Sequence, residues 1–136
     1  MSGAIPVGHH ESPPVAAGVA HRVPSIGRES TLRQVSEQLA REPSGALLVH
    51  DAGEPIEVIS LRDVTTAIAS GADPDRVTVG DIELIKRPYI TGAAEVDDVA
   101  EALVRVAVDE ALVLDHDGLV GLLCLRDLCH VLALRG

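Results

Sequence analysis

Hydrophobic residues follow a helical spacing in two separate stretches of the chain. In each of the segments 32–39 and 96–103, apolar side chains fall at positions i, i+3 and i+7, which places them on one face of a helix. Ser30 is the expected N-cap of the first helix, while Asp97 and Asp98 favour the start of the second through its dipole. We therefore predict an amphipathic helix in each stretch.

Short apolar runs flank each of these helices and predict β-strands. They cover residues 23–26, 46–50 and 55–60 in the first half and 88–90, 111–114 and 119–124 in the second. Between the last two runs of each half lie Asp51-Ala52-Gly53 and His116-Asp117-Gly118, which are typical of hairpin turns. A final helix is predicted over residues 61–70, ending at Gly71, and another over residues 125–134.

The two halves are copies of one unit. An ungapped shift of 64 positions lays residues 24–65 on 88–129, so that Leu61-Arg62-Asp63 falls on Leu125-Arg126-Asp127. A fixed spacing of this kind indicates a duplicated supersecondary unit. The other identical pairs are Pro24/Pro88, Ile26/Ile90, Val35/Val99, Glu37/Glu101, Leu39/Leu103, Arg41/Arg105, Leu48/Leu112, Val49/Val113 and Asp51/Asp115.

Each unit has the order β-α-β-β-α. A copy of about 60 residues with one apolar sheet face is too small to stand alone, so the copies should bury those faces against each other. We predict a mixed α/β (α+β) fold of two tandem repeats packed with pseudo-two-fold symmetry. Residues 1–18, which are rich in Gly, Pro and Ala, are assigned to a flexible tail, 19–82 to the first repeat and 83–136 to the second.

Composition narrows the range of functions. The formal net charge is −10, from 21 acidic and 11 basic residues, and Tyr89 is the one aromatic residue. Such a chain repels polyanions and lacks stacking platforms, so we predict no nucleic-acid binding. No apolar run approaches the ~18 residues that cross a bilayer, and no Lys or Arg precedes Arg22 as a secretory signal would require. We predict a cytoplasmic protein without membrane association, in which Cys124 and Cys129 are buried, reduced thiols.

The repeated unit resembles a CBS domain, and the pair resembles a Bateman module of the bacterial stand-alone type. The likeness rests first on a motif that occurs at residues 58–64 and again at 122–128: two apolar residues, Ser or Cys, any residue, Arg, Asp and a further apolar residue. It rests also on the hairpin that precedes each motif and on Val79-Gly80-Asp81-Ile82 in the connector. It covers residues 19–134. The resemblance implies a regulatory module, most often a homodimer, that binds AMP, ADP, ATP or S-adenosylmethionine between its repeats and signals to another protein.

The resemblance also implies the site residues. Asp63 and Asp127 would bind the ribose, because a carboxylate can accept hydrogen bonds from both hydroxyls of a cis-diol. Ser60 would lie near the phosphate, with Cys124 at the same place in the second copy. Further candidates are Arg62, Arg126, Lys86, Arg87 and Arg22 for phosphate, Tyr89 for stacking, and the backbone around Gly45, Ala46, Leu47, Asp109, Glu110 and Ala111 for the adenine edge.

Several alternatives remain open from the sequence. Ser60-x-x-Asp63 is also a helix capping box, which needs no ligand. Cys124 and Glu57 depart from the family pattern, which favours a ligand-free structural or dimerisation module. Tyr89 could equally lie at the edge of the core. The histidines 21, 50, 116 and 130 are expected at the surface, and Asp115-His116-Asp117 lies in a turn without a fourth ligand, so no metal site is predicted.

An enzyme is not expected. The sequence contains no nucleophile elbow and no Gly-rich phosphate loop, and no pair of acids can be placed in one pocket. No cofactor is expected to be required. The leading hypothesis is therefore a sensor of an adenosine-containing ligand, and the alternative is an interaction module with no ligand.

Overall fold

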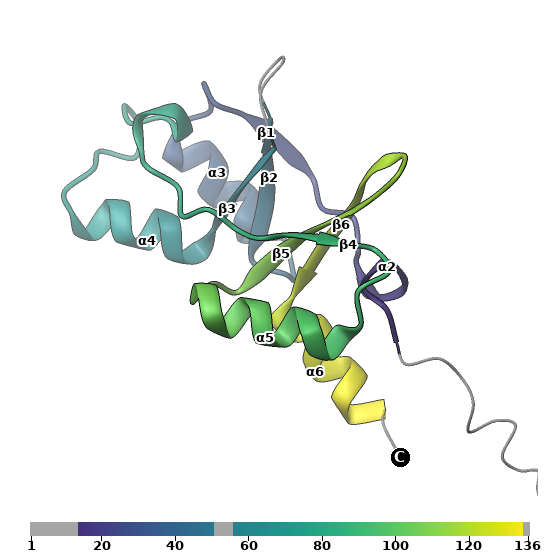
Figure 1. Cartoon of the computed structure of the whole chain (residues 1–136). Helices are drawn as coiled ribbons and strands as arrows, with labels where there is room; N and C mark the ends of the chain where they lie inside the picture. The colour runs from purple at the N-terminus through teal and green to yellow at the C-terminus, as the bar shows by residue number, and fades with distance from the viewer. Residues whose placement is uncertain (1–13, 51–55, 135–136) are drawn as a thin grey trace, which may run out of the picture.

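The two halves form two three-stranded sheets of the same topology. The computed structural model describes residues 14–50 and 56–134. The first sheet has the order β1 (Ser25–Gly27), β2 (Ala46–His50) and β3 (Glu57–Ser60), and the second has β4 (Tyr89–Thr91), β5 (Glu110–Asp115) and β6 (Gly118–Cys124). In each, the first two strands are parallel and the last two antiparallel. Figure 1 shows the two sheets beside each other, with the helices on the outside.

The strand register repeats with the offset found in the sequence. Ser25 pairs with Leu48 and Tyr89 with Leu112, and Ala46 opposite Ser60 is matched by Glu110 opposite Cys124. The tandem β-α-β-β-α fold is thus confirmed. The first turn, residues 51–53, lies outside the described residues. In the second, Gly118 has φ +119°, a conformation that favours glycine.

Helices flank the sheets where the periodicity predicts them. The first repeat contains α3 (Leu32–Leu39) and α4 (Leu61–Ala69), and the second contains α5 (Val96–Val106) and α6 (Leu125–Leu134). The N-cap prediction for α3 is wrong by one residue: Thr31, not Ser30, forms a capping box with Gln34. A 3-10 turn, η2 (Val79–Asp81), lies in the connector. No helix in residues 14–50 and 56–134 is long and apolar enough to cross a bilayer.

Three clusters make up an aliphatic core. One lies under each repeat, and the third contains Ala46, Leu48 and Val58 from the first sheet with Leu112 and Leu122 from the second. The repeats therefore bury their sheet faces against each other, as predicted. Both cysteines are free thiols, but only Cys124 is buried; the burial predicted for Cys129 is wrong, because it lies on the exposed face of α6.

The segment ahead of β1 packs on the second repeat. Helix α2 (Ala16–Val19) hydrogen-bonds through the Ala16 and Ala17 N–H groups to the carbonyls of Ala94 and Gly92, and Ala16 is fully buried. His21 then pairs with Leu122 in an antiparallel bridge. Residues 14–18, assigned to the flexible tail from composition, are therefore ordered, since their backbone groups are bonded to the second half. The rest of that tail, residues 1–13, lies outside the described residues.

Candidate functional site

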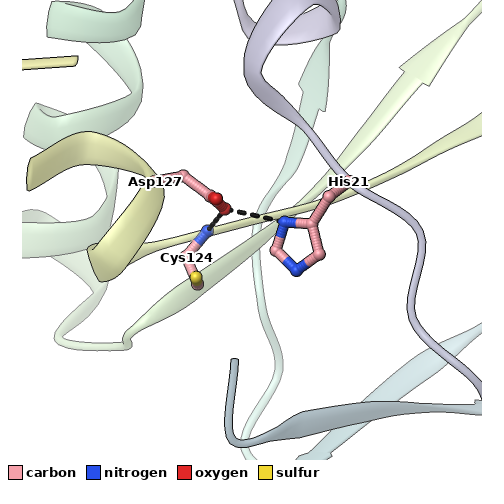
Figure 2. A group of neighbouring side chains, drawn as sticks. All are labelled: His21, Cys124 and Asp127. Atoms are coloured by element: carbon pink, nitrogen blue, oxygen red, sulfur yellow. Dashed lines mark hydrogen bonds and ion pairs between the residues drawn. The ribbon is translucent and has the colours of Figure 1, made fainter. Parts of the chain in front are cut away.

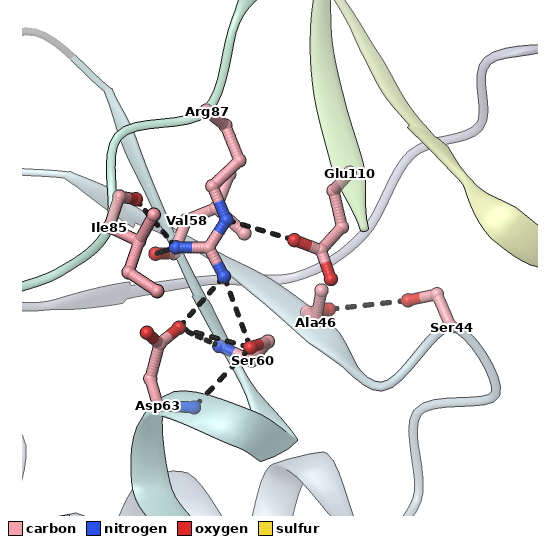
Figure 3. A network of polar contacts seen from close by, with 8 residues as sticks. All are labelled: Ser44, Ala46, Val58, Ser60, Asp63, Ile85, Arg87 and Glu110. Carbon is pink, nitrogen blue, oxygen red and sulfur yellow. Dashed lines mark hydrogen bonds and ion pairs between the residues drawn. The ribbon is translucent and has the colours of Figure 1, made fainter. Parts of the chain in front are cut away.

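Arg87 occupies the space between the repeats, in front of the first predicted ribose acid. Figure 3 shows its guanidinium pointing at Asp63 and Ser60 on one side and at Glu110 on the other. Nη2 donates to Asp63 Oδ2 at 2.9 Å and to Ser60 Oγ at 3.1 Å, and Nε donates to Glu110 Oε1 at 2.9 Å. Nη1 donates to the carbonyls of Val58 and Ile85. These five bonds match the five N–H donors of an arginine.

Asp63 and Ser60 also form the capping box at the start of α4. The Ser60 N–H donates to Asp63 Oδ2 at 2.8 Å, and the Asp63 N–H lies 3.5 Å from Ser60 Oγ. The Ser60 hydroxyl donates to the same carboxylate at 3.0 Å. Both side chains are buried. Asp63 thus binds its own helix start and Arg87, in the arrangement that the capping alternative anticipates.

The ion-pair network is buried, so its charges depend on one another. Burial disfavours the charged guanidinium, but the facing carboxylates of Asp63 and Glu110 outweigh it, and the pKa of Arg87 is raised. Burial also raises the pKa of Glu110, an effect that the Arg87 charge opposes. A buried charge whose partner is removed costs several kcal/mol, roughly 3–5. Arg87 was named from the sequence as a phosphate-binding candidate, but all its N–H groups are bonded within the protein and link the two repeats.

The second predicted ribose acid has different neighbours. Asp127 Oδ2 accepts a 2.7 Å hydrogen bond from the Cys124 N–H and lies 2.9 Å from Nδ1 of His21. Figure 2 shows the carboxylate of Asp127 pointing at both of these groups. The contact with His21 is close but not aligned as a hydrogen bond, and Nδ1 is a buried atom. Burial raises the pKa of the Cys124 thiol. His21, expected at the surface, is instead half-buried against Asp127.

A wide crevice lies where α4 and α6 begin. Its volume is about 750 Å³, and it brings together seven of the residues named from the sequence. They are Gly45, Ser60, Arg62, Asp109, Glu110, Cys124 and Arg126. The lining thus contains two arginines and two acids. Asp63 and Asp127 are not among its lining residues.

A second, smaller cleft of about 430 Å³ opens on the other side of Arg87. Both repeats line it: Arg28, Ile56, Glu57 and Val58 from the first, and Ile85, Lys86, Arg87, Tyr89 and Leu112 from the connector and the second. Arg28 forms an ion pair with Glu57. The Tyr89 hydroxyl donates to the Ile56 carbonyl, which holds the ring at the rim. Of the residues named from the sequence, Lys86, Arg87 and Tyr89 lie here.

Of the remaining predicted residues, Arg22 is exposed and lines neither cleft, and the other three are part of the core. Ala46, Leu47 and Ala111 are fully buried, and each is paired in its strand ladder, opposite Ser60, Ile59 and Leu123 respectively. Their side chains pack in the three clusters described above. None of the three lines either cleft. Gly45, which precedes β2, is buried as well, but it lines the 750 Å³ crevice.

Sequence reasoning missed the roles of two residues that shape these sites: Glu110, named only for its backbone, and His21, expected at the surface. Glu110 is a buried acid that opens an otherwise apolar strand, at the position where the first copy has Ala46. Such an acid indicates a buried cation, and Arg87 stands where the first copy has Val23. These two differences between the copies could have identified the Arg87–Glu110 pair. For His21 no such signal exists, because its bridge to Leu122 is a tertiary contact.

Comparisons with known proteins agree on one family. The CBS domain family model matches residues 16–70 and 79–134. A CBS domain protein from Pyrobaculum aerophilum, PAE2072, solved in complex with AMP, is 28% identical with a TM-score of 0.72, over 88% of this chain and 95% of that chain. The CBS domain protein TA0289 from Thermoplasma acidophilum is 21% identical with a TM-score of 0.76, over 85% and 67%. A search of curated protein sequences gives no match.

Proposed function

The chain belongs to the CBS-domain family as a tandem pair, and we propose that it is a regulatory module that binds an adenine mononucleotide in the 430 Å³ cleft beside Arg87. The observation that carries the proposal is the lining of this cleft, which is contributed by both repeats. A ligand bound there contacts both halves, so its occupancy can change how they sit together. The output would act on another protein.

The chemistry of the cleft suits a nucleoside with one phosphate. Ile56, Val58, Ile85 and Leu112 offer an apolar wall for a base, and the Tyr89 ring lies at the rim. Its volume is within the roughly 300–1,000 Å³ of small-molecule sites. The AMP complex of the Pyrobaculum relative supports this ligand class. That relative is similar to nearly the full length of this chain.

Charge favours a monophosphate over a polyphosphate. Lys86 is the cation at the cleft that a phosphate would meet, next to the Arg28–Glu57 pair. The whole chain carries a net charge of −10, which disfavours each further phosphate. In this account Asp63 and Ser60 act through Arg87, which they hold as the inner wall of the cleft, rather than by contacting the ribose.

Calorimetry with AMP, ADP, ATP and S-adenosylmethionine tests the proposal. We expect AMP to bind most tightly, and Lys86→Glu to weaken it by roughly tenfold or more, because the reversed charge repels the phosphate. Arg62→Glu makes the same charge change in the 750 Å³ crevice and is the matched control, which should leave AMP binding unchanged. Absence of heat for all four ligands at millimolar concentration, or an unaltered affinity of Lys86→Glu, contradicts the proposal.

A ligand-free interaction module is the second candidate. It is favoured by the engagement of both helix-start acids, Asp63 with Arg87 and Asp127 with His21 and the Cys124 N–H. Large apolar side chains on α4 and α6 are exposed, which favours a homodimer through these helices. They are Leu61, Ile68, Leu125, Leu132 and Leu134. Ligand-independent dimerisation, measured by light scattering, together with a thermal midpoint that no nucleotide shifts, would favour this candidate.

A further inference from the structure

Three metal-ligating side chains converge at the second repeat from distant parts of the chain. His21 precedes β1, Cys124 ends β6, and Asp127 lies in the first turn of α6. One ligand atom from each, the His nitrogen, the Cys sulfur and a carboxylate oxygen, all lie within 4.8 Å of one another. Figure 2 shows the three side chains around one point. We infer that His21, Cys124 and Asp127 form a zinc-binding site, independent of the nucleotide proposal.

The donor set and its spacing fit Zn²⁺. Imidazole nitrogen, thiolate sulfur and carboxylate oxygen are its three common protein ligands, at bond lengths of about 2.0–2.3 Å. Tetrahedral coordination at those lengths separates the ligand atoms by about 3.3–3.6 Å. His21 Nδ1 and Asp127 Oδ2 lie 2.9 Å apart, and the three ligand atoms lie within 4.8 Å of one another, so side-chain rotations would bring them to these separations around an ion.

His21 is held in place with its ligating atom turned inward. Its backbone exchanges two hydrogen bonds with Leu122, of 2.9 and 2.8 Å, which fixes the residue on β6. Nδ1 is buried and has no aligned hydrogen bond in the part of the chain that the structure describes. A buried ring nitrogen without an aligned hydrogen bond is costly, and a metal ion would satisfy it. The ligand therefore needs little ordering before it binds.

Asp127 can bind the ion without giving up its structural contact. Its Oδ2 accepts the Cys124 N–H, and a carboxylate has two oxygens with about four acceptor positions. Cys124 also lines the 750 Å³ crevice, so water can reach the fourth coordination position from there. On binding, the thiol releases its proton to the solvent as the zinc–sulfur bond forms.

The chain contains a second group of metal-ligating residues that serves as an internal control. Asp115, His116 and Asp117 also come close together, but all three are exposed and adjacent in one turn. Asp115 already accepts the Asp117 N–H at 2.8 Å. With no sulfur ligand and no burial, we expect this group to bind zinc weakly at best.

Zinc titration of chelator-treated protein, without nucleotide, tests the site. We expect one Zn²⁺ per chain, a rise in the thermal midpoint, and a loss of affinity of roughly tenfold or more in His21→Asn and in Cys124→Ser. The controls Cys129→Ser and His116→Ala remove the exposed cysteine and a histidine of the turn and should bind zinc as the unaltered chain does. Equal binding by all four variants, or loss only in His116→Ala, overturns the inference and assigns the zinc to the turn.

Cobalt spectroscopy gives a readout that does not depend on how Cys124→Ser folds. In Cys129→Ser, Cys124 is the remaining cysteine, since the chain has two. Co²⁺ bound to its thiolate should give the charge-transfer absorption of a cobalt–sulfur bond, and added Zn²⁺ should remove that absorption. Absence of the band at saturating Co²⁺ rules out a thiolate ligand and with it the site. Its presence while AMP fails to bind would leave this inference standing and the nucleotide proposal refuted.

Discussion

The two repeats carry the same Leu-Arg-Asp sequence at the start of a helix, yet they use its acid differently. In the first repeat, Asp63 is buried in an ion-pair network with Arg87, and the network also binds Glu110. In the second, Asp127 is partly exposed and lies beside His21 and the Cys124 thiol. The comparison shows that a duplicated motif preserves backbone geometry, while the neighbours contributed from outside the unit decide what its acid does.

One pair of corresponding residues accounts for much of this difference. At Gly121, an added Cβ would lie 2.3 Å from the His21 carbonyl oxygen, so only glycine allows the His21 backbone to pair with Leu122. The first copy has Glu57 at the matching position. There the carbonyl of Val58, which corresponds to Leu122, accepts from Arg87 instead, and the 430 Å³ cleft opens beside it. Glu57, a departure from the family pattern, thus accompanies the open cleft.

Substitution of Arg87 should give the largest difference in stability between the two repeats. Arg87→Met leaves Asp63 and Glu110 buried without a counter-charge, so the free energy of unfolding should fall by about 3–5 kcal/mol in urea denaturation. His21→Asn alters the corresponding contact in the second repeat and should cost less than about 1 kcal/mol, because that contact is partly solvated. Equal costs would mean that the two sites are equivalent.

A triple variant separates charge from packing. Arg87→Met combined with Asp63→Asn and Glu110→Gln removes all three charges of the network. We expect it to recover part of the stability lost in Arg87→Met alone, because no unpaired charge remains. A triple variant less stable than the single one would show that the network contributes by hydrogen bonding and shape instead.

Substitution of Gly121 should give the next largest loss of stability. In Gly121→Ala the new methyl group collides with backbone, so we expect a loss of about 1–3 kcal/mol and weaker amide protection at Leu122. Glu57→Ala is the matched change in the first repeat and should cost less than about 1 kcal/mol, since it breaks a half-exposed ion pair. Unchanged hydrogen exchange at Leu122 in Gly121→Ala would contradict the role given to this glycine.

The helix caps should give the smallest effect. Ser60→Ala removes the hydroxyl that caps α4, at a cost of about 1 kcal/mol. Cys124→Ser, in metal-free buffer, places a hydroxyl at the matching position of α6, and the stability should change by less than in Ser60→Ala. Thermal unfolding of the two variants compares them directly. A larger loss in Cys124→Ser would show that the thiol is needed for packing.

The fold was predictable from the sequence because the repeat offset is visible in the residues themselves. The shift of Leu48-Val49 onto Leu112-Val113 reappears as the strand register of both sheets. The start of α4 was also predictable, since a capping box is a local feature of Ser60 and Asp63. Both predictions rest on contacts between residues close in the sequence or repeated within it.

The residues that contact Asp63 and Asp127 were harder to predict from the sequence. Arg87 reaches Asp63 across 24 positions, and His21 reaches Asp127 from the segment ahead of β1. Such contacts depend on how the two repeats pack together, and the sequence pattern within one repeat does not predict this packing. The N-cap of α3 was missed for a different reason, because Ser30 and Thr31 are adjacent and both can cap.

Chemical-shift mapping of the unaltered chain with AMP tests the central claim most directly, that the cleft opened beside Arg87 is the ligand site. The account predicts shifts of the amides of Ile56, Lys86 and Tyr89, with those of Arg62, Leu125 and Arg126 unmoved. Shifts confined to the beginnings of α4 and α6 would contradict it and move the site to the 750 Å³ crevice.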